Sequence, residues 1–503
     1  MNMRRRELCK SIVTLSTSLV VCKTNSKEQS DSGGIKISSP QNVLFFGSSH
    51  NASEMFLRAI RYLNTHGGGD LYVPSGEYSF DDTVYITINT RITIITASNS
   101  LFIKKTDSDL FSIEATITGS MRILGHGEFI YNGPKTNKAA CVRFKNQTKG
   151  RGIASSSFEI NGRMRIRKGR YEWKYGLYLE NTRDTIIQGI QIDGLSSELH
   201  RSKQIGIYSV SNDSPSVSWT ICNVQLNDLY IGFYFECNHV PGIEGLKIIN
   251  CDIVGVATGI SYVNNTKYFP PQIEIIGCHI NGYDDLISIN KSLSIHIVSC
   301  LLYRSGSKGG FIRFTGVQDV TINSVSFAII DVKTDVPGIV LDGRLSTSAF
   351  VRVDNCHYWA YHKKSPFISL LGDIKTISLG LSTKDSYGKW IDTVNLSSPK
   401  SNVSIDTETI ALTKHDYGDL IGCDLECKEG VLNLSDVVIG PTFISSDVPI
   451  KKLVSGKINK RYILIMKDKA NFSDDINILN IEEFSKGKSI IEIVCVGDDY
   501  YCI

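Results

Sequence analysis

Hydrophobic and polar residues alternate along the middle of the chain, and each alternating run leads to a small residue followed by a polar one. The period of two predicts β-strands, because successive side chains of a strand point to opposite faces. From Ile190 to Cys356, the residues in this slot are separated by 32, 29, 27, 22, 25 and 31 positions. An internal repeat of such irregular length is typical of a solenoid. The slot is filled by Ile190, Cys222, Cys251, Cys278, Cys300, Val325 and Cys356.

A second apolar run follows most of these strands after a short turn, as in IGFYF, TGISYV, DLISIN, GFIRF, GIVLD and PFISL. Two or three short strands per coil, stacked about 4.8 Å apart, predict a parallel β-helix whose loops vary in length while the coil stays constant. We interpret the cysteines as packed core thiols. Cys423 and Cys427 in CDLEC leave a metal site or a disulfide open, but we predict no metal and no cofactor.

Residues 42–90 predict the start of the solenoid. An amphipathic helix, which would cover the open edge of the first coil, ends at Gly67–Gly69 and precedes a strand and a turn at Pro74–Gly76. The apolar stripe of the helix is Met55, Phe56, Ala59, Ile60 and Leu63. The passage also contains Val43, Phe46, Gly47, Ala59, Ile60, Leu63, Gly67–Gly69, Leu71, Tyr72, Val73, Pro74, Gly76 and Tyr78. Through these residues it resembles the pectate-lyase-type right-handed parallel β-helix superfamily, whose members act on polysaccharides.

Within that superfamily, the chain is most similar to the tailspike polysaccharide depolymerases of bacteriophages and prophages. The resemblance implies an all-β protein: a right-handed single-stranded parallel β-helix with an N-terminal capping helix and a small C-terminal β-rich module. We therefore divide the chain into a signal-like or anchoring segment with a linker (1–40), a β-helix domain that binds or cleaves glycan (41–400) and a C-terminal module (401–503). The resemblance also implies a homotrimer.

The ends and the charge of the chain bear on location and partners. The first 22 residues are basic and then apolar, the layout of an export signal, and Arg5-Arg6 resembles the twin-arginine signal. A short helical anchor on a larger particle is the alternative, so we expect an exported, extracellular protein or a component of a phage virion tail. A net charge of +3 from 54 basic and 51 acidic residues implies no broad basic face and no nucleic-acid partner. No apolar run reaches about 18 residues, so no integral membrane span is expected.

Asp284 and Asp285 are the most suggestive candidates for catalysis, because they lead into a strand at a turn where side chains leave the stack. The segment resembles the Asp-Asp element of polygalacturonases. The other elements of that family are missing, and their positions hold Thr258, Gly309, Gly310, Val340 and Asp342. We conclude that the chain is not a polygalacturonase.

The aspartate pair still suits glycoside hydrolysis, which needs one protonated and one ionised carboxyl group, because neighbouring aspartates push their pKa values apart. Asp335 falls two coils beyond Asp285 in nearly the same register, about 9–10 Å away and at the wide end of the spacing for an inverting enzyme. We predict Asp284, Asp285 and Asp335 as catalytic residues. Ordinary turn chemistry is the alternative for all three.

Cations on the same face suit an acidic bacterial polysaccharide, since guanidinium groups match carboxylate geometry. The predicted substrate-binding residues are Tyr283, Lys308, Arg313 and Arg344. Further candidates are the arginine-rich strand with its aromatic tail at 163–175, the segment 357–364, and Glu198 with His200 as an acid or base.

The leading hypothesis is a polysaccharide depolymerase, a glycoside hydrolase that acts on bacterial capsular or surface polysaccharide. A polysaccharide lyase is the close alternative, in which Lys308 or Arg313 removes a proton beside a uronate carboxylate. The third hypothesis is a non-catalytic glycan-binding attachment protein with the same coil. Convergence of the three aspartates on one groove would favour an enzyme.

Overall fold

The structure is a computed structural model. It describes residues 40–359 apart from 137, 148, 150–156, 196–202, 271, 307–308, 330–336 and 344–347, and beyond residue 359 mainly single strands and the residues beside them. By its internal contacts the chain divides into residues 1–35 and 36–503, and every described residue lies in the second unit.

Two parallel sheets wind through the coils of the solenoid. Among the described residues sheet A has 22 strands, and most coils give it two strands or one long bent strand. Its strands are β1 (Gln41–Asn42), β2 (Gly69–Val73), β3 (Gly76–Phe80), β5 (Arg91–Thr96), β6 (Ser100–Lys104), β8 (Ser120–Tyr131), β10 (Ser157–Lys168), β12 (Arg183–Gln188), β13 (Gln191–Asp193), β15 (Ser216–Cys222), β16 (Gln225–Asn227), β18 (Ile243–Ile249), β19 (Asp252–Val256), β21 (Ile273–Ile276), β22 (His279–Gly282), β24 (Ser294–Val298), β25 (Leu301–Arg304), β27 (Asp319–Asn323), β28 (Ser326–Ile329), β30 (Ser348–Trp359), β32 (Ile374–Ser382) and β34 (Asn402–Ile405).

Sheet B has 12 strands, one from each coil that contributes to it. They are β4 (Val84–Ile88), β7 (Phe111–Ala115), β9 (Ala140–Asn146), β11 (Tyr175–Glu180), β14 (Ile205–Ser211), β17 (Ile231–Cys237), β20 (Thr258–Asn264), β23 (Ile287–Asn290), β26 (Ile312–Thr315), β29 (Ile339–Asp342), β31 (Ile368–Leu371) and β33 (Val394–Leu396).

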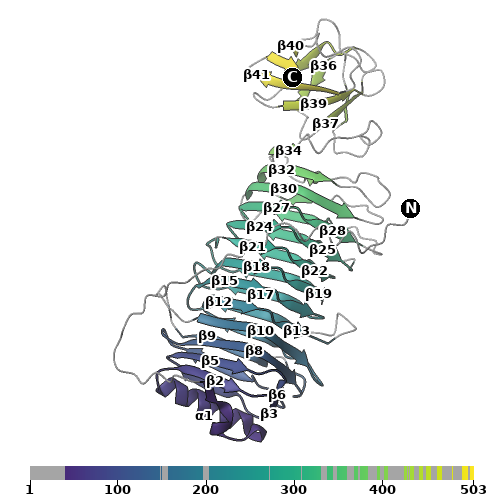
Figure 1. Cartoon of the computed structure of the whole chain (residues 1–503). Helices are drawn as coiled ribbons and strands as arrows, with labels where there is room; N and C mark the ends of the chain where they lie inside the picture. The colour runs from purple at the N-terminus through teal and green to yellow at the C-terminus, as the bar shows by residue number, and fades with distance from the viewer. Residues whose placement is uncertain are drawn as a thin grey trace, which may run out of the picture. The chain divides into compact units, whose positions relative to one another are not determined.

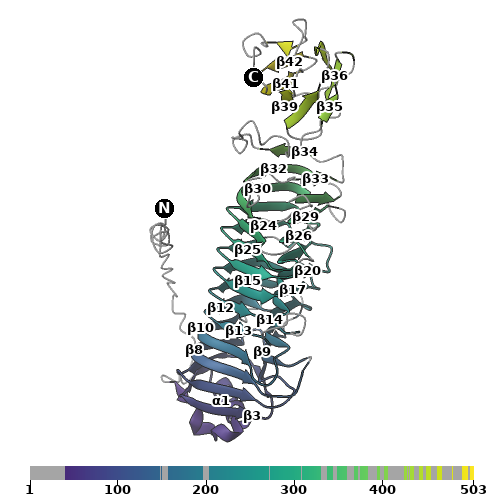
Figure 2. The same cartoon turned by 90° about the vertical axis from the view of Figure 1, so that its right-hand side faces the viewer.

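The coils stack along one axis, as Figures 1 and 2 show from two directions. Each strand pairs in parallel with its counterpart in the next coil, so Ile260 lies opposite Ile287, and Ile287 lies opposite Ile312. Neighbouring coils are therefore one strand spacing apart, about 4.8 Å. The predicted parallel β-helix is confirmed.

The predicted ladder of small core residues is confirmed with one correction, at Cys222. Cys222 lies opposite Ile249 on the outward side and is half-buried, whereas the fully buried Val224 occupies the slot above Cys251. The slot directly follows a residue in the left-handed region, which for Val224 is Asn223 with φ of 53°. This turn fixes the slot, and the alternation of apolar residues alone did not reveal it. The left-handed residues are Gly189, Asn223, Asn250, Gly277, Ser299, Ser324 and Asn355.

The cysteines of the ladder are packed core thiols, as predicted. Cys251, Cys278 and Cys300 are buried, and each thiol donates to the carbonyl oxygen two residues earlier, at 3.3, 3.4 and 3.3 Å. The neighbouring Cys251 thiol, and then burial, raise the pKa of Cys278 to about 12. Because the thiolate is the reactive form, Cys278 is inert at neutral pH.

The predicted capping helix is confirmed as α1 (Ala52–Thr65), which follows the short 3-10 helices η1 (Val43–Phe46) and η2 (Ser49–Asn51). Its stripe of Met55, Phe56, Ala59, Ile60 and Leu63 is buried in the same core as the first coils. Figure 1 shows the helix at the N-terminal end of the stack. The ring of Phe56 lies among four aromatic rings, with centroids 5.4–6.0 Å away, from Tyr78, Phe80, Phe102 and Phe111.

The described part of the C-terminal hundred residues consists mainly of strands. A six-stranded mixed sheet contains β35 (Asp424–Glu426), β37 (Pro441–Ser445), β39 (Arg461–Met466), β40 (Ile478–Leu479), β41 (Ile490–Val496) and β42 (Asp499–Cys502), and a two-stranded sheet contains β36 (Val431–Asn433) and β38 (Lys452–Val454). Cys423 and Cys427 lie outside the described residues. Over the described ranges, no helix has both the length and the apolar character that crossing a membrane requires.

Phe56→Ala should destabilise the N-terminal end of the β-helix by about 3–5 kcal/mol, since it leaves a cavity among four aromatic rings. Arg58→Ala on the exposed face of α1 is the matched control and should change stability by at most about 0.5 kcal/mol. Urea unfolding followed by circular dichroism measures both effects. Equal unfolding midpoints for the two variants would show that the helix does not seal the core.

Candidate functional site on the outer face of sheet B

Outward side chains of sheet B form rows that run along the axis, because strands of successive coils pair in register. Tyr178 of β11, Tyr208 of β14 and Tyr234 of β17 lie directly opposite one another, and we call these three residues the tyrosine ladder. Arg143 of β9 precedes the ladder in the same row. Ser261, Ser288 and Arg313 continue the row beyond it.

The tyrosine ladder is a continuous aromatic surface. The ring centroids of Tyr178 and Tyr208 are 5.0 Å apart, and those of Tyr208 and Tyr234 are 5.3 Å apart. Tyr175 joins the ladder edge-on to Tyr178, and the Arg143 guanidinium lies 4.0 Å from the centroid of the Tyr178 ring. All four tyrosines are half-buried, so part of each ring faces solvent.

The ladder tyrosines keep their protons at neutral pH. Burial raises the pKa of Tyr178 to about 12. Burial also raises the pKa of Tyr208, as does its hydrogen bond to Glu236, in which the hydroxyl donates to Oε2 at 2.6 Å. The phenols are therefore hydrogen-bond donors and poor bases.

A second row, two residues further along each strand, carries carboxylates. Glu114, Lys145, Glu180, Val210 and Glu236 lie opposite one another in successive coils, and we call them the carboxylate row. Only Val210 separates Glu180 from Glu236, so their backbones are two coil steps apart, about 9.5 Å.

The two carboxylates differ in their partners. Glu180 is largely buried and forms an ion pair with Lys145 at 3.0 Å. Glu236 is half-buried and accepts hydrogen bonds from the Tyr208 hydroxyl and, at 3.1 Å, from the Asn238 amide. Over the described ranges, no cation pairs with Glu236.

A repeated glycine explains how the tyrosine ladder is placed. The sequences Gly176-Leu-Tyr, Gly206-Ile-Tyr and Gly232-Phe-Tyr put each ladder tyrosine two residues after a glycine. A Cβ atom at Gly206 would lie 2.7 Å from the carbonyl oxygen of Gly232, and a Cβ atom at Gly176 or Gly232 would lie 2.6 Å from a carbonyl oxygen of the next coil. The Gly-x-Tyr repeat is the sequence signal for this face, although the residues predicted from the sequence as site residues do not include the ladder.

Asp285, predicted as catalytic, lies at the edge of the same sheet, and its carboxylate binds two groups of the next coil. Its Oδ2 accepts from Arg313 Nε at 2.7 Å, and its Oδ1 accepts from the backbone N–H of Gly310 at 2.6 Å. Asp109 makes the same contacts near the other end of sheet B, with Arg143 Nε at 2.6 Å and with the backbone N–H of Ala140 at 2.7 Å. We call this arrangement the Asp–Arg clip.

The two clips are equivalent in register. Asp109 and Asp285 each precede a buried leucine and a strand of sheet B, and each arginine follows its backbone N–H donor by three residues. Recurrence in coils far apart indicates a structural role in joining coils. Arg313, predicted to bind substrate, has its Nε committed to this clip.

The other predicted site residues are only partly described. Asp284 is half-buried, and its carboxylate has no ion pair or hydrogen bond with any residue that the structure describes. Burial, and then the charge of Asp228, raise the pKa of Tyr283, so its phenol stays protonated. Asp335, Lys308 and Arg344 lie outside the described residues, so convergence of the three aspartates stays a prediction.

The remaining candidates from the sequence differ in where the structure places them. Trp173 from the predicted aromatic tail is fully buried and packs on Tyr131, with centroids 4.7 Å apart, so it is core and does not offer a ring to sugar. Tyr175 from the same tail lies beside the tyrosine ladder. Glu198 and His200 lie outside the described residues. Within the described ranges, no group of three or more His, Cys, Asp or Glu side chains could hold a metal ion.

Comparison with known proteins gives structural likeness only. No protein-family model and no curated protein matches the chain. Solved structures similar to it include ORF18 of Geobacillus virus E2 (14% identity, TM-score 0.36, 76% of this chain and 62% of that one) and the A-module of the mannuronan C-5 epimerase AlgE6 of Azotobacter vinelandii (15%, 0.38, 72% and 98%). A third is the tailspike protein gp49 of Acinetobacter baumannii bacteriophage Fri1, a capsular polysaccharide depolymerase (8%, 0.35, 73% and 61%). The chain thus spans 62% of the Geobacillus virus protein and 61% of the tailspike, and the likeness concerns the fold alone.

Asp285→Asn and Asp109→Asn should lower the free energy of unfolding by similar amounts, about 1 kcal/mol each, because each breaks an Asp–Arg clip whose arginine is partly screened by solvent. Asp319→Asn, an exposed carboxylate on β27, is the control and should leave stability unchanged. Urea unfolding midpoints measure all three variants. A loss of stability in Asp109→Asn but not in Asp285→Asn would contradict the structural role of Asp285.

Proposed function

We propose that the protein is a polysaccharide depolymerase that binds glycan along the outer face of sheet B and hydrolyses it with Glu180 and Glu236. The observation that carries the proposal is the placement of these two carboxylates in one row, two coils apart, beside the tyrosine ladder. Inverting glycosidases hold their two carboxyl groups about 6.5–9.5 Å apart, which leaves room for the attacking water. The spacing of two coils is close to that range.

The surroundings of the two carboxylates suggest their roles. Glu180, held by Lys145, is suited to act as the base that activates water. Glu236 has no cation among its described partners, so we assign to it the role of the acid that protonates the leaving oxygen. The tyrosine ladder supplies apolar ring faces and phenolic donors, so it would bind and orient the sugar residues on either side of the cleaved bond.

Hydrolysis is favoured over elimination, because the candidate bases on this face are protonated or already hydrogen-bonded. A lyase needs a deprotonated group beside the uronate carboxylate. The raised pKa values of Tyr178 and Tyr208 keep those phenols protonated, and Arg313 is engaged by Asp285. The substrate that we propose is a bacterial capsular or surface polysaccharide, the class implied by the resemblance of the chain's layout to tailspike depolymerases. Action on such a substrate accords with an exported protein or a virion tail protein, and we propose a homotrimer as its assembly.

Glu236→Gln and Glu180→Gln should each slow glycan cleavage by about 10²–10⁴-fold, because each removes the acid or the base. Glu114→Gln is the matched control: it lies in the same row, but Lys145 separates it from Glu180, and it should cleave normally. The assay incubates purified capsular polysaccharides with each variant and measures both new reducing ends and ultraviolet absorbance of unsaturated ends. Wild-type protein should give reducing ends without absorbance.

Other results of this assay identify the alternatives. Absorbance of unsaturated ends would establish a lyase and overturn hydrolysis. Unimpaired cleavage by Glu180→Gln and Glu236→Gln, with loss in Asp284→Asn or Asp285→Asn, would return the chemistry to the aspartate pair; Asp109→Asn controls for loss of the clip alone. A glycan that is bound tightly but cut by no form of the protein would indicate an attachment protein.

Tyr234→Ala should raise KM about tenfold with a smaller effect on kcat, because stacking on a half-buried ring stabilises bound substrate by about 1.4 kcal/mol. Tyr85→Ala is the control: Tyr85 begins the same row but is separated from the ladder by Ser112 and Arg143. Initial rates over a range of glycan concentration measure both variants. An equal rise in KM in both variants would remove the tyrosine ladder from the substrate path.

A further inference from the structure

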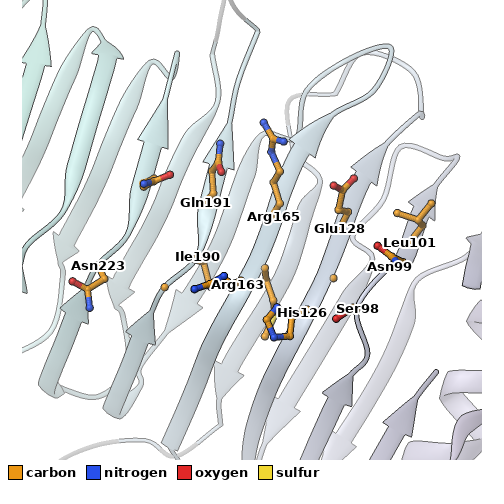
Figure 3. Close-up of a pocket in the computed structure, with 14 residues that line it drawn as sticks. Ser98, Asn99, Leu101, His126, Glu128, Arg163, Arg165, Ile190, Gln191 and Asn223 are labelled. Atoms are coloured by element: carbon orange, nitrogen blue, oxygen red, sulfur yellow. The ribbon is translucent and has the colours of Figure 1, made fainter. Parts of the chain in front are cut away.

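A groove of about 640 Å³ lies on sheet A, at the corner where the two strands of a coil meet, and Figure 3 shows its lining. We call it the corner groove. It extends from the coil of β5–β6 to the coil of β15–β16 and lies on a different sheet from the tyrosine ladder. Its lining residues are Ser98, Asn99, Leu101, His126, Gly127, Glu128, Arg163, Met164, Arg165, Gly189, Ile190, Gln191, Asn223 and Gln225.

The groove exists because the corner differs in length from coil to coil. We define the corner as the residues between the last outward residue of the first strand and the first outward residue of the second. In the coils of β12–β13 and β15–β16, the strand register shows that the corner has two residues. The bent strands β8 and β10 have three, Gly125–Gly127 and Gly162–Met164, and the coil of β5–β6 has five, 96–100. The longer corners of β5–β6, β8 and β10 therefore project beyond the shorter corners of the next two coils, and the groove lies beside them.

His126 and Arg163 are the middle residues of the two three-residue corners and lie opposite each other in register. Both side chains are exposed, and Figure 3 shows them at the bends of neighbouring strands. Neither forms an ion pair or a hydrogen bond with any residue that the structure describes. An arginine left without a carboxylate in a concave site is prepared to bind an external anion.

The other charges of the corner groove are already balanced. Glu128 pairs with Arg167 at 2.7 Å, and Arg165 pairs with Asp193 at 2.6 Å. Arg163 therefore remains as the uncompensated charge among the described lining residues.

Hydrogen bonds around Asp193 hold part of the lining in place. Its Oδ1 accepts from the amides of Gln191 and Asn227, each at 2.8 Å, while its Oδ2 holds Arg165. Gln191 and Arg165 both line the corner groove, so a ligand meets side chains that are already oriented. Such preorganisation lowers the entropy lost on binding.

The lining also indicates what kind of ligand the groove would hold. Among the described residues, no Phe, Tyr or Trp lines it, so it offers no ring to stack on a sugar face. Amide and hydroxyl groups instead surround the cation, and they suit a ligand with many hydroxyl groups and one acidic group. They come from Ser98, Asn99, Gln191, Asn223 and Gln225.

We propose that the corner groove is a second glycan-binding site, which takes a uronic acid residue with its carboxylate on the Arg163 guanidinium and with His126 beside it. The sugar nature of the ligand rests on the proposed function, whereas the requirement for a carboxylate rests on Arg163. The groove holds the glycan while the outer face of sheet B cuts it, so the substrate is an acidic polysaccharide.

The test measures protection of His126 from diethyl pyrocarbonate, read by mass spectrometry in the Glu236→Gln protein so that no ligand is consumed. The probes are trigalacturonate, a hyaluronan hexasaccharide and, as the neutral counterpart, galactotriose. At about ten times its Kd, an acidic probe should slow modification of His126 about tenfold, while galactotriose should not. His296, exposed on another row of sheet A, is the internal reference and should react at an unchanged rate.

Arg163→Gln should abolish the protection, and Arg352→Gln, which removes the same charge several coils away, should keep it. Equal protection by galactotriose, retained protection in Arg163→Gln, or no protection by either acidic probe would each overturn the proposal. These results are independent of sheet B, because His126 reports only on the corner groove. Loss of cleavage in Glu236→Gln tests the proposed function separately.

Discussion

The structure depends on one constraint: every coil must lie one strand spacing above the last, in register, so that its backbone hydrogen bonds reach the next coil. At about 4.8 Å, each inward position has its equivalents directly above and below, which explains the ladder of Cys, Val and Ile behind the left-handed turn. The close approach of Gly206 to Gly232 follows from the same spacing. The Asp–Arg clip also follows from this spacing, because an aspartate just before one strand reaches an arginine on the paired strand of the next coil.

The same constraint determines where function can arise. Outward side chains in a regular stack form straight rows, and a row becomes an extended surface when successive coils carry related residues. The tyrosine ladder is such a surface, and the carboxylate row beside it places Glu180 and Glu236 at two coil steps. The corner groove has the opposite origin, since it appears where coils differ in length and the rows are interrupted. The regular register of the coils thus produces the extended surface on sheet B, whereas the differing corner lengths produce the concave site on sheet A.

The sequence predicted the fold well because the fold is periodic. The alternation of apolar residues, the capping helix and the second apolar run of each coil all appear where they were expected. The ladder was misplaced only at Cys222, because the left-handed turn at Asn223 shifts the inward positions by one residue, so that Val224 and not Cys222 follows Ile221 into the core. The candidate site was harder to predict. Asp285 lies just before a strand, β23 of sheet B, as expected, but its contacts with Gly310 and Arg313 become visible only in three dimensions. The Gly-x-Tyr repeat is a signal in the sequence that could have predicted the tyrosine ladder. The corner groove, in contrast, depends on corner lengths that only the strand register reveals.

We propose that glycan lies along the outer face of sheet B, across the tyrosine ladder. The most direct test is a crystal structure of the Glu236→Gln protein with an oligosaccharide prepared from the glycan that the wild-type protein cleaves. We expect sugar rings on Tyr178, Tyr208 and Tyr234, with a glycosidic oxygen between the side chains at positions 180 and 236. A glycan bound at another part of the β-helix, with the tyrosine ladder empty, would contradict it.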